Sequence, residues 1–407
     1  MIRSLWSHRS RRRLILVAAN IANGLLLPLL NPLVAIVVVR LASIELWGEY
    51  VALLIGVQLA AHIIGWGNKD YLLRQFSFSP AHLGGLWRSS LITRSLLLLP
   101  FGVLVWWIEP GRATWLLIWC GVLVVDQAFE VWVTYRKDFV FSSVVELIGL
   151  LVMLAGVGLT GARLNADGLI AISIVSTSIK AVIYGLRYRS SLLAPSPDRS
   201  SRMIELAYFR RAFTFFALGL TGLLQSRIDL YVVSLFLSKG VVGQYQVFMT
   251  FMLYLQALSN FVLGPFVKNL YRLSYRALLS LSLRLLALGM VICLPALFLL
   301  GGLLRQVYGF DLPPIFFVLG GAVALPIYFY LPIIYGLYKS GRTGRVAWIN
   351  VLGIAISAAV GVWLLPVLGM VGAVLGATTA QALMLLAYVW QSHELREKHA
   401  LPVPELS

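Results

Sequence analysis

The sequence predicts an all-α polytopic membrane protein with twelve transmembrane helices, arranged as two six-helix lobes related by a parallel pseudo-two-fold axis. Three observations lead to this fold class. The 407 residues are 60% hydrophobic and only 12% charged, about half the charged share of a soluble domain. The apolar residues gather into runs long enough to cross a bilayer. A short motif also recurs at corresponding places in the two halves of the chain.

Twelve apolar segments have roughly the length that a membrane-spanning helix needs. The first follows a basic N-terminal stretch and continues to Val39 without a small-residue cleavage site. We therefore expect a retained membrane helix there and not a signal peptide. The predicted spans are 14–39, 48–67, 89–108, 114–134, 139–160, 168–187, 212–237, 241–266, 277–300, 314–337, 346–366 and 369–390.

The basic residues orient these spans. Most of the 33 Lys and Arg residues lie at the N-terminus and in every second connector. By the positive-inside rule, this side and both termini are cytoplasmic. The net charge of +17 does not indicate nucleic-acid binding, because the basic residues separate apolar runs and do not gather in one hydrophilic domain. The connectors of the opposite side hold only Arg40, Arg112, Arg163, Lys239 and Arg305.

The connectors are too short for a soluble domain on either face. The longest of them, polar and basic, separates the sixth span from the seventh. The predicted organisation is an N-terminal six-helix lobe (1–187), a cytoplasmic linker (188–211), a C-terminal six-helix lobe (212–390) and a cytoplasmic tail (391–407).

The two halves carry the same short motif after their first spans. It contains a serine, a glycine and a tyrosine at matching positions, Ser43, Gly48 and Tyr50 in the first half and Ser238, Gly243 and Tyr245 in the second. Six spans in each half give both halves the same orientation. A parallel repeat of this kind is typical of transporters.

Six ionisable side chains are predicted to lie at one depth in the cytoplasmic half of their spans. Such residues face a bundle interior or a water-filled cavity, so we expect them to line a vestibule that opens to the cytoplasm. A second interpretation is that Arg94 pairs with Asp126 or Glu130, and Glu146 with Lys180. These pairs would hold the lobe together or exchange partners during gating. The set comprises Arg94, Asp126, Glu130, Glu146, Lys180 and Arg284.

Arg227 and Asp229 lie deeper, near the middle of the seventh span. Being two residues apart, they point to different sides of a helix and do not pair with each other. An arginine in a lumen offers a bidentate donor for pyrophosphate, which a lysine matches less well. Asp229 is either a proton or cation site that biases two states, or a satisfied acceptor for an asparagine or for Lys180.

Few residues suggest other chemistry. Cys120, Cys293 and the five histidines show no metal-ligand spacing, and there is no nucleophile–base pair, so we expect neither a metal cofactor nor an enzyme. His62 is a proton-relay candidate or a packed polar residue. Gly372 and Gly376 lie on a small-residue face of the last span, which predicts close helix packing.

Stretches such as RLASIELWGEY, SRIDLYVVSLFLSKGVVGQY and GMVGAVLGATTA resemble the polysaccharide flippases (Wzx-type, O-antigen type) of the multidrug/oligosaccharidyl-lipid/polysaccharide (MOP) exporter superfamily. The resemblance implies two lobes around a cation-lined cavity. It also implies movement of undecaprenyl-pyrophosphate-linked oligosaccharide from the inner to the outer leaflet of the bacterial inner membrane by alternating access, for surface polysaccharide biosynthesis. Polysaccharide polymerase and chain-length proteins are the protein partners it suggests. A monomer is sufficient.

One departure concerns the first span, where relatives that handle peptidoglycan precursor carry an arginine and this chain carries asparagines. An alternative function is a cation-coupled drug or metabolite antiporter of the same fold. Four bases and four acids inside the spans, with an arginine deepest, fit an anionic head group better. Coupling to H⁺ or Na⁺ is left open. The predicted pyrophosphate and lumen residues are Arg227, Arg284, Arg94, Lys180, Asn20 and Asn23, and the predicted ion-coupling or gating residues are Asp229, Asp126, Glu130 and Glu146.

Overall fold

A computed structural model describes residues 32–78, 82–192, 204–263 and 270–399, and within these ranges the chain is helical with no strand. Ten candidate membrane spans occur there, and each overlaps one of the predicted spans, although Ile44–Phe78 and Tyr275–Tyr308 run well past the predicted ends at 67 and 300. They are Ile44–Phe78, Leu83–Ile108, Ala113–Arg136, Phe139–Arg163, Ala166–Leu192, Lys239–Leu263, Tyr275–Tyr308, Pro314–Lys339, Thr343–Leu368 and Met370–Ser392.

The first and seventh predicted spans are not among these ten. Most of 14–39 lies outside the described residues, and only the apolar helix Pro32–Leu41 represents it. The seventh corresponds to α10 (Ala207–Phe236), which is long enough to cross a bilayer but less apolar, because it contains Arg227 and Asp229. The twelve-span count and the two-fold repeat stay predictions.

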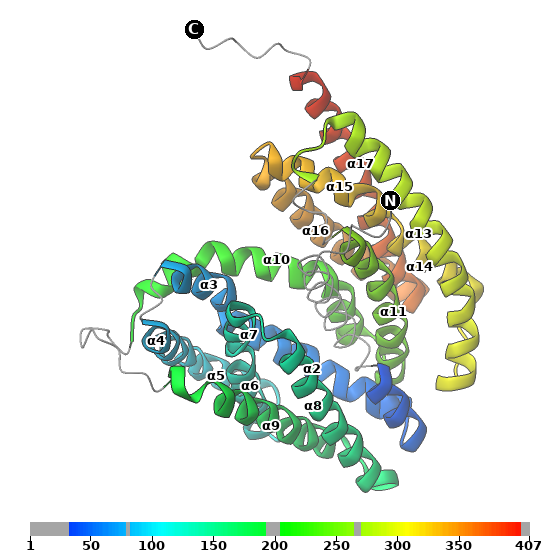
Figure 1. The fold of residues 1–407 in the computed structure, drawn as a ribbon. Helices are drawn as coiled ribbons and strands as arrows, with labels where there is room; N and C mark the ends of the chain where they lie inside the picture. Colours follow the sequence, from blue (N-terminus) through cyan, green and yellow to red (C-terminus); the bar gives the residue numbers. More distant parts are fainter. Residues whose placement is uncertain (1–31, 79–81, 193–203, 264–269, 400–407) are drawn as a thin grey trace, which may run out of the picture. The chain divides into compact units, whose positions relative to one another are not determined.

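The chain divides into two compact units, Met1–Leu220 and Thr221–Ser407. The division falls inside α10, so the first half of this helix packs with the N-terminal unit (Figure 1). The predicted linker is described only in part, and the predicted domain limits stay a prediction.

In the N-terminal unit, α9 packs against α8 and α6, and α2 against α6. The second, third and fourth of the predicted spans correspond to candidate spans that each consist of two helices in sequence. The helices are α2 (Ile44–Gly65), α3 (Asn68–Phe78), α4 (Leu83–Ser95), α5 (Leu98–Ile108), α6 (Ala113–Ala128), α7 (Glu130–Arg136), α8 (Phe139–Thr160) and α9 (Ala166–Leu192).

The interruption between α2 and α3 depends on a glycine. Trp66 and Gly67 both have positive φ, at 45° and 67°. A Cβ on Gly67 would lie 2.5 Å from the backbone nitrogen of Phe216 in α10. Trp66 stacks on Phe216 with ring centroids 4.1 Å apart and donates its indole N–H to the Phe209 carbonyl at 2.8 Å. The interruption and the first half of α10 are therefore packed on each other.

Interrupted helices leave carbonyl groups that water cannot satisfy inside a bilayer. Helix α4 supplies donors for two of them. Arg94 donates from Nη1 to the carbonyl of Gly65, the last residue of α2, at 3.2 Å. Trp87 donates to the carbonyl of Ala128, the last residue of α6, at 2.8 Å. Seven residues apart on one helix, Trp87 and Arg94 lie on the same face of α4.

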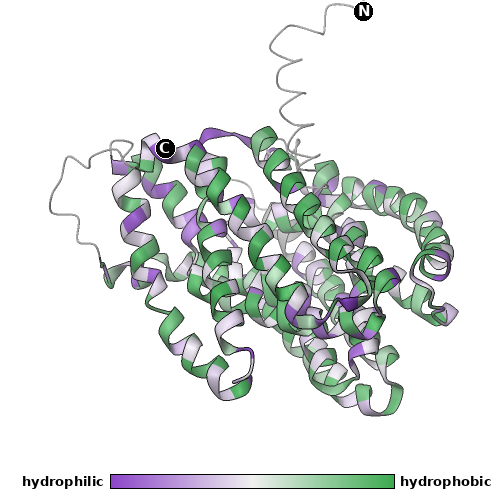
Figure 2. Cartoon of the chain, turned by 90° about the horizontal axis from the view of Figure 1, so that it is seen from below, coloured by the Kyte–Doolittle hydropathy of each residue, from purple (hydrophilic) through white to green (hydrophobic). Residues whose placement is uncertain are grey.

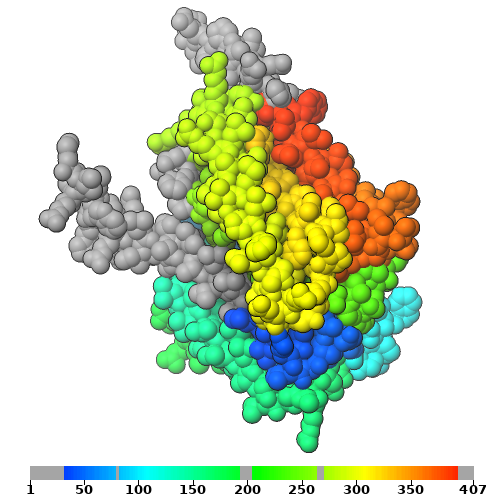
Figure 3. Space-filling view, turned by 90° about the vertical axis from the view of Figure 1, so that its right-hand side faces the viewer, coloured from blue at the N-terminus to red at the C-terminus, as the bar shows by residue number. Residues whose placement is uncertain are grey.

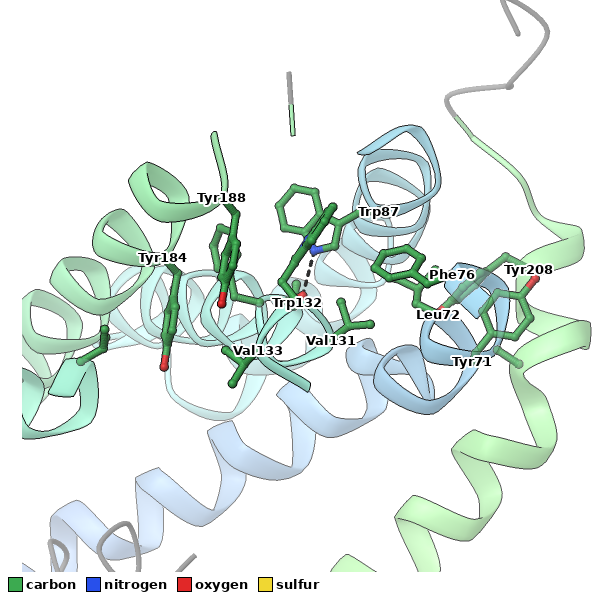
Figure 4. Packing of buried hydrophobic residues seen from close by; sticks show 14 residues of the cluster. Tyr71, Leu72, Phe76, Trp87, Val131, Trp132, Val133, Tyr184, Tyr188 and Tyr208 are labelled. Atoms are coloured by element: carbon green, nitrogen blue, oxygen red, sulfur yellow. Dashed lines mark hydrogen bonds between the residues drawn. The ribbon is translucent and has the colours of Figure 1, made fainter. Parts of the chain in front are cut away.

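An aromatic core lies where α3, α4, α7 and α9 meet. In Figure 4, Trp132 lies between Tyr188 and Phe76, with ring centroids 5.9 and 5.2 Å from its own. Phe129 and Trp87 extend the cluster at 5.2 Å from each other. Rings of this size dominate packing energetics, so this core fixes the ends of four helices.

The C-terminal unit consists of a second set of helices, and α16 and α17 are the two that pack most closely. A Cβ on Gly372 would lie 2.6 Å from the backbone of Leu364, and one on Gly376 would lie 2.8 Å from the carbonyl oxygen of Ser357. The predicted small-residue packing face is confirmed. The helices are α11 (Lys239–Leu263), α13 (Tyr275–Leu303) with η5 (Leu304–Tyr308), α14 (Pro314–Ala324), α15 (Pro326–Lys339), α16 (Thr343–Leu368) and α17 (Met370–His399).

Most residues of the described helices are hydrophobic, as the green colour in Figure 2 shows. In Figure 3, α13 runs over the surface from yellow-green to yellow; its Leu294 and Phe298 are 59% and 85% exposed. Large apolar side chains facing outward along full helices are typical of contact with acyl chains. The chain is a multi-pass membrane protein.

Candidate functional site

The predicted charged layer contains one tight cluster, which we call the Lys180 triad (Lys180, Asp126 and Glu146). The ammonium Nζ of Lys180 lies 3.0 Å from Asp126 Oδ2 and 3.0 Å from Glu146 Oε2. The three side chains are 15%, 10% and 16% exposed. The predicted pairing of Glu146 with Lys180 is confirmed, and Asp126 joins it.

The backbone of α8 makes room for this cluster. The aliphatic stem of Lys180 crosses Gly149, where a Cβ would lie 2.7 Å from its Cδ. Ser176, one turn before Lys180 on α9, donates to the Gly149 carbonyl at 2.8 Å. The second carboxylate oxygen of Asp126 is buried and accepts no hydrogen bond from the described residues. Two carboxylates share one ammonium, so the triad carries a net charge of −1 when all three groups are ionised.

Arg94 is not a member of this cluster, and the predicted pairing with Asp126 or Glu130 is wrong. Its side chain is buried, with its donors directed at the carbonyls of Ser90 and Gly65, both at 3.2 Å. A cation is favourable at a helix C-terminus, where the macrodipole is negative. The guanidinium therefore stabilises the end of α2 and does not neutralise a carboxylate.

Glu130 also lies apart from the triad. It pairs with Lys69 of α3 at 3.1 Å, and both side chains are about half exposed. Arg284, on α13 of the other unit, is exposed and forms no ion pair with the described residues. Asn20 and Asn23 lie outside the described residues. Of the six side chains predicted for one layer, the structure brings three together.

In the C-terminal unit, Asp229 is buried and accepts a hydrogen bond from the hydroxyl of Tyr245 at 2.5 Å. This partner is neither of those the sequence suggested. Arg227 is half-buried and forms no ion pair with the described residues. Asp229 is thus a satisfied acceptor.

The sequence repeat could have identified Tyr245 as this partner. Tyr50, its counterpart in the first half, also forms a buried hydrogen bond to another helix, with Ser173 at 2.8 Å. A tyrosine that follows the same glycine in both halves therefore joins two helices in each unit. The Nε2 of His62 is buried beside Gly219 without a hydrogen-bond partner among the described residues, and its role as a proton relay or a packed polar residue stays open.

A second cluster of charged side chains joins the N-terminal ends of α2, α6 and α9. Arg112, in the turn before α6, lies 2.7 Å from Glu49 and 2.6 Å from Asp167. Partial burial lowers the pKa of Arg112, but the hydrogen bonds to the two carboxylates outweigh this effect and raise its pKa overall. This cluster holds three helices at one end of the unit.

The fold matches known transporters over nearly its whole length. The structure of the lipid II flippase MurJ in an inward closed conformation has a TM-score of 0.69 at 14% identity, with 93% of this chain and 87% of that one covered. A multidrug resistance MATE family transporter of the MOP superfamily, inward-facing, has a TM-score of 0.65 at 12% identity, covering 92% and 96%. A MATE protein in the bent conformation gives 0.54 at 12% identity, covering 95% of each chain.

Two other comparisons gave no match: no family model and no curated protein matches the sequence. At these identities the structural likeness shows the fold alone. The chain has the fold of MOP-type transporters and flippases, in agreement with the resemblance of its sequence to that superfamily.

Proposed function

We propose that the chain is a flippase that moves an undecaprenyl-pyrophosphate-linked oligosaccharide from the inner to the outer leaflet of the bacterial inner membrane by alternating access. The MOP-type fold supports transport, since it is the fold of the lipid II flippase and of multidrug transporters. We use the charged residues of this chain to choose between a lipid-linked cargo and a small-molecule cargo.

The proposal depends on which charged side chains inside the spans have partners in the structure and which form no ion pair. The four acids that the sequence places inside spans all have partners in the structure. Of the four bases, Lys180 is neutralised and Arg94 bonds to backbone carbonyls. Arg227 and Arg284 form no ion pair with the described residues. Two cations in the C-terminal unit are therefore left for a ligand, which favours an anionic cargo there.

Arg227 is the residue that best fits a pyrophosphate. A guanidinium in a partly desolvated site donates two parallel hydrogen bonds to phosphate oxygens. Asp229 accepts a hydrogen bond from the hydroxyl of Tyr245 on α11 and forms no ion pair with the arginine among the described residues.

The alternative is a cation-coupled drug or metabolite antiporter of the same fold. The Lys180 triad favours it, since a buried cluster with a net charge of −1 could take up a proton or a cation. Within our proposal the same cluster would serve ion coupling or gating in the N-terminal unit.

The test is transport in proteoliposomes that contain a pyrophosphate-linked polyprenyl glycan with a fluorescent sugar. We expect the glycan to become accessible to an impermeant oxidant added outside. Arg227→Ala should abolish this transfer, and Arg227→Lys should retain part of it because the charge survives without the bidentate geometry. Arg272→Ala, an exposed arginine in a connector, is the control and should transport normally.

Two outcomes would contradict the proposal. Unchanged transfer by Arg227→Ala, with normal protein levels, would remove the arginine from the cargo site. Transport of a cationic dye against a proton gradient, with no movement of the glycolipid, would establish the antiporter instead.

A further inference from the structure

One end of the N-terminal unit carries a group of exposed cations that transport does not use. We call it the basic rim; it lies where α7 ends, α8 begins and α9 ends. All of its side chains are exposed. The turn and the end of α9 lie together, since Arg136 bonds to Ser191 and Tyr188 to Asp138. The basic rim consists of Arg136, Lys137, Arg187 and Arg189.

Two of these cations are held in place by aromatic rings. The guanidinium of Arg136 lies 5.8 Å from the ring centroid of Trp132 and 5.5 Å from that of Tyr188, both part of the rigid core in Figure 4. Arg187 lies 5.2 Å from the ring of Phe141. Cation–π contacts of this kind reduce the freedom of the side chain before any ligand arrives. The planar guanidinium groups of the rim are therefore pre-organised for a bidentate acceptor such as phosphate.

The rim has a surplus of positive charge. The one carboxylate that faces it among the described residues is Asp138, which lies 3.7 Å from Arg187 and accepts a hydrogen bond from Tyr188 at 3.3 Å. One carboxylate against four cations leaves a net charge of +3 for a ligand.

The rim also stands at the end of two apolar stripes. On α8, Val140, Val144, Leu147 and Leu151 are 46–65% exposed and recur every three or four residues, so they share one face. The first of them follows the rim directly. Because α8 lies in the candidate span Phe139–Arg163, we expect this stripe to face acyl chains.

The neighbouring helix α9 repeats the arrangement. Val182 and Leu186 are 60% and 62% exposed and lie on one face, and Arg189 follows one turn later on that face. Helices α8 and α9 pack against each other along the unit. Two adjacent lipid-facing stripes therefore end at one cluster of cations.

We propose that the basic rim and the two stripes bind an anionic phospholipid, with its phosphate on the rim and its acyl chains along α8 and α9. The topology rule for basic residues requires positive charge in a connector, but it does not require cations stacked on rings above apolar stripes. A zwitterionic lipid fits less well, because its own ammonium is repelled by the surplus charge of the rim. The site is independent of the transported cargo.

The experiment measures lipid retention. The purified full chain is placed in nanodiscs with equal amounts of phosphatidylglycerol and phosphatidylethanolamine of identical acyl chains. Lipids that stay bound are then counted by native mass spectrometry. We expect phosphatidylglycerol to be retained in preference. Each cation removed from the rim should weaken retention roughly fivefold, from about 1 kcal/mol per basic residue near an anionic surface.

A matched pair of variants isolates the rim from general charge. Arg189→Gln removes a cation at one end of the α8–α9 pair, and Arg163→Gln removes an equally exposed one at the opposite end. Only the first should lower retention. Lys137→Gly is a second test that leaves the backbone unstrained, because Lys137 has a φ of 59° that glycine adopts readily.

Thermal unfolding of each variant in detergent checks that its fold is intact. Equal losses for Arg189→Gln and Arg163→Gln, or equal retention of both lipids by the unaltered chain, would overturn the proposal.

Discussion

Removal of the ammonium from the Lys180 triad should be strongly destabilising. Lys180→Met keeps an apolar stem of similar length across Gly149 but leaves Asp126 and Glu146 buried, 10% and 16% exposed, without their shared cation. Breaking a buried ion pair by removing one partner costs about 3–5 kcal/mol in the free energy of unfolding. At about 2–4 °C per kcal/mol for a unit of this size, the melting temperature should fall by roughly 6–20 °C.

The assay is thermal unfolding of the purified protein in detergent, with Lys69→Met as the matched control. Lys69 forms an ion pair of nearly the same length with Glu130, but both side chains are about half exposed. Solvent screening limits such a pair to about 0.2–1 kcal/mol. The triple variant D126N/E146Q/K180M should regain most of the loss, because no uncompensated charge remains. Equal shifts for Lys180→Met and Lys69→Met would refute the reasoning.

Two further predictions concern helix geometry and the Asp229 hydrogen bond. Gly67→Ala should destabilise the protein by about 1–3 kcal/mol or more, because φ is +67° and the new Cβ meets Phe216. Gly56→Ala, with nothing within 4 Å of its Cβ, should leave the melting temperature unchanged or slightly raised, and equal losses for both would contradict the packing argument. Tyr245→Phe should cost about 1.5–3 kcal/mol, since it removes a hydrogen bond to a buried carboxylate, and a melting temperature equal to that of the unaltered chain would show that Asp229 has another donor.

Bilayer thickness explains why the spans were predictable. A membrane helix needs about 20 apolar residues whatever it packs against, so its length and composition mark it without tertiary information. The pairing of Glu146 with Lys180 was predictable for a related reason. Their spans are consecutive and joined by a short connector, which makes them antiparallel neighbours.

The hydrogen-bond partners of Arg94 could not be predicted from the sequence. Opposite charges on consecutive spans suggested an ion pair. The guanidinium instead bonds to the carbonyl of Gly65, which is free to accept a side-chain donor because α2 ends at this residue. The sequence records residues and not backbone acceptors, so it could not show that the Gly65 carbonyl, near the end of the predicted span 48–67, takes the arginine as its donor. Gly67, with a φ of +67°, permits the change of direction that follows.

The placement of the unit boundary inside α10 has a consequence for biosynthesis. A chain emerging from the ribosome completes the spans from Ile44 to Leu192 first, yet Trp66 then still lacks Phe209 and Phe216, which it contacts in the finished protein. The interruption after α2 can be closed only when the first half of α10 has also been made. The N-terminal unit therefore matures after the start of the seventh helix is synthesised, and two gene fragments separated at the connector would each encode an incomplete half.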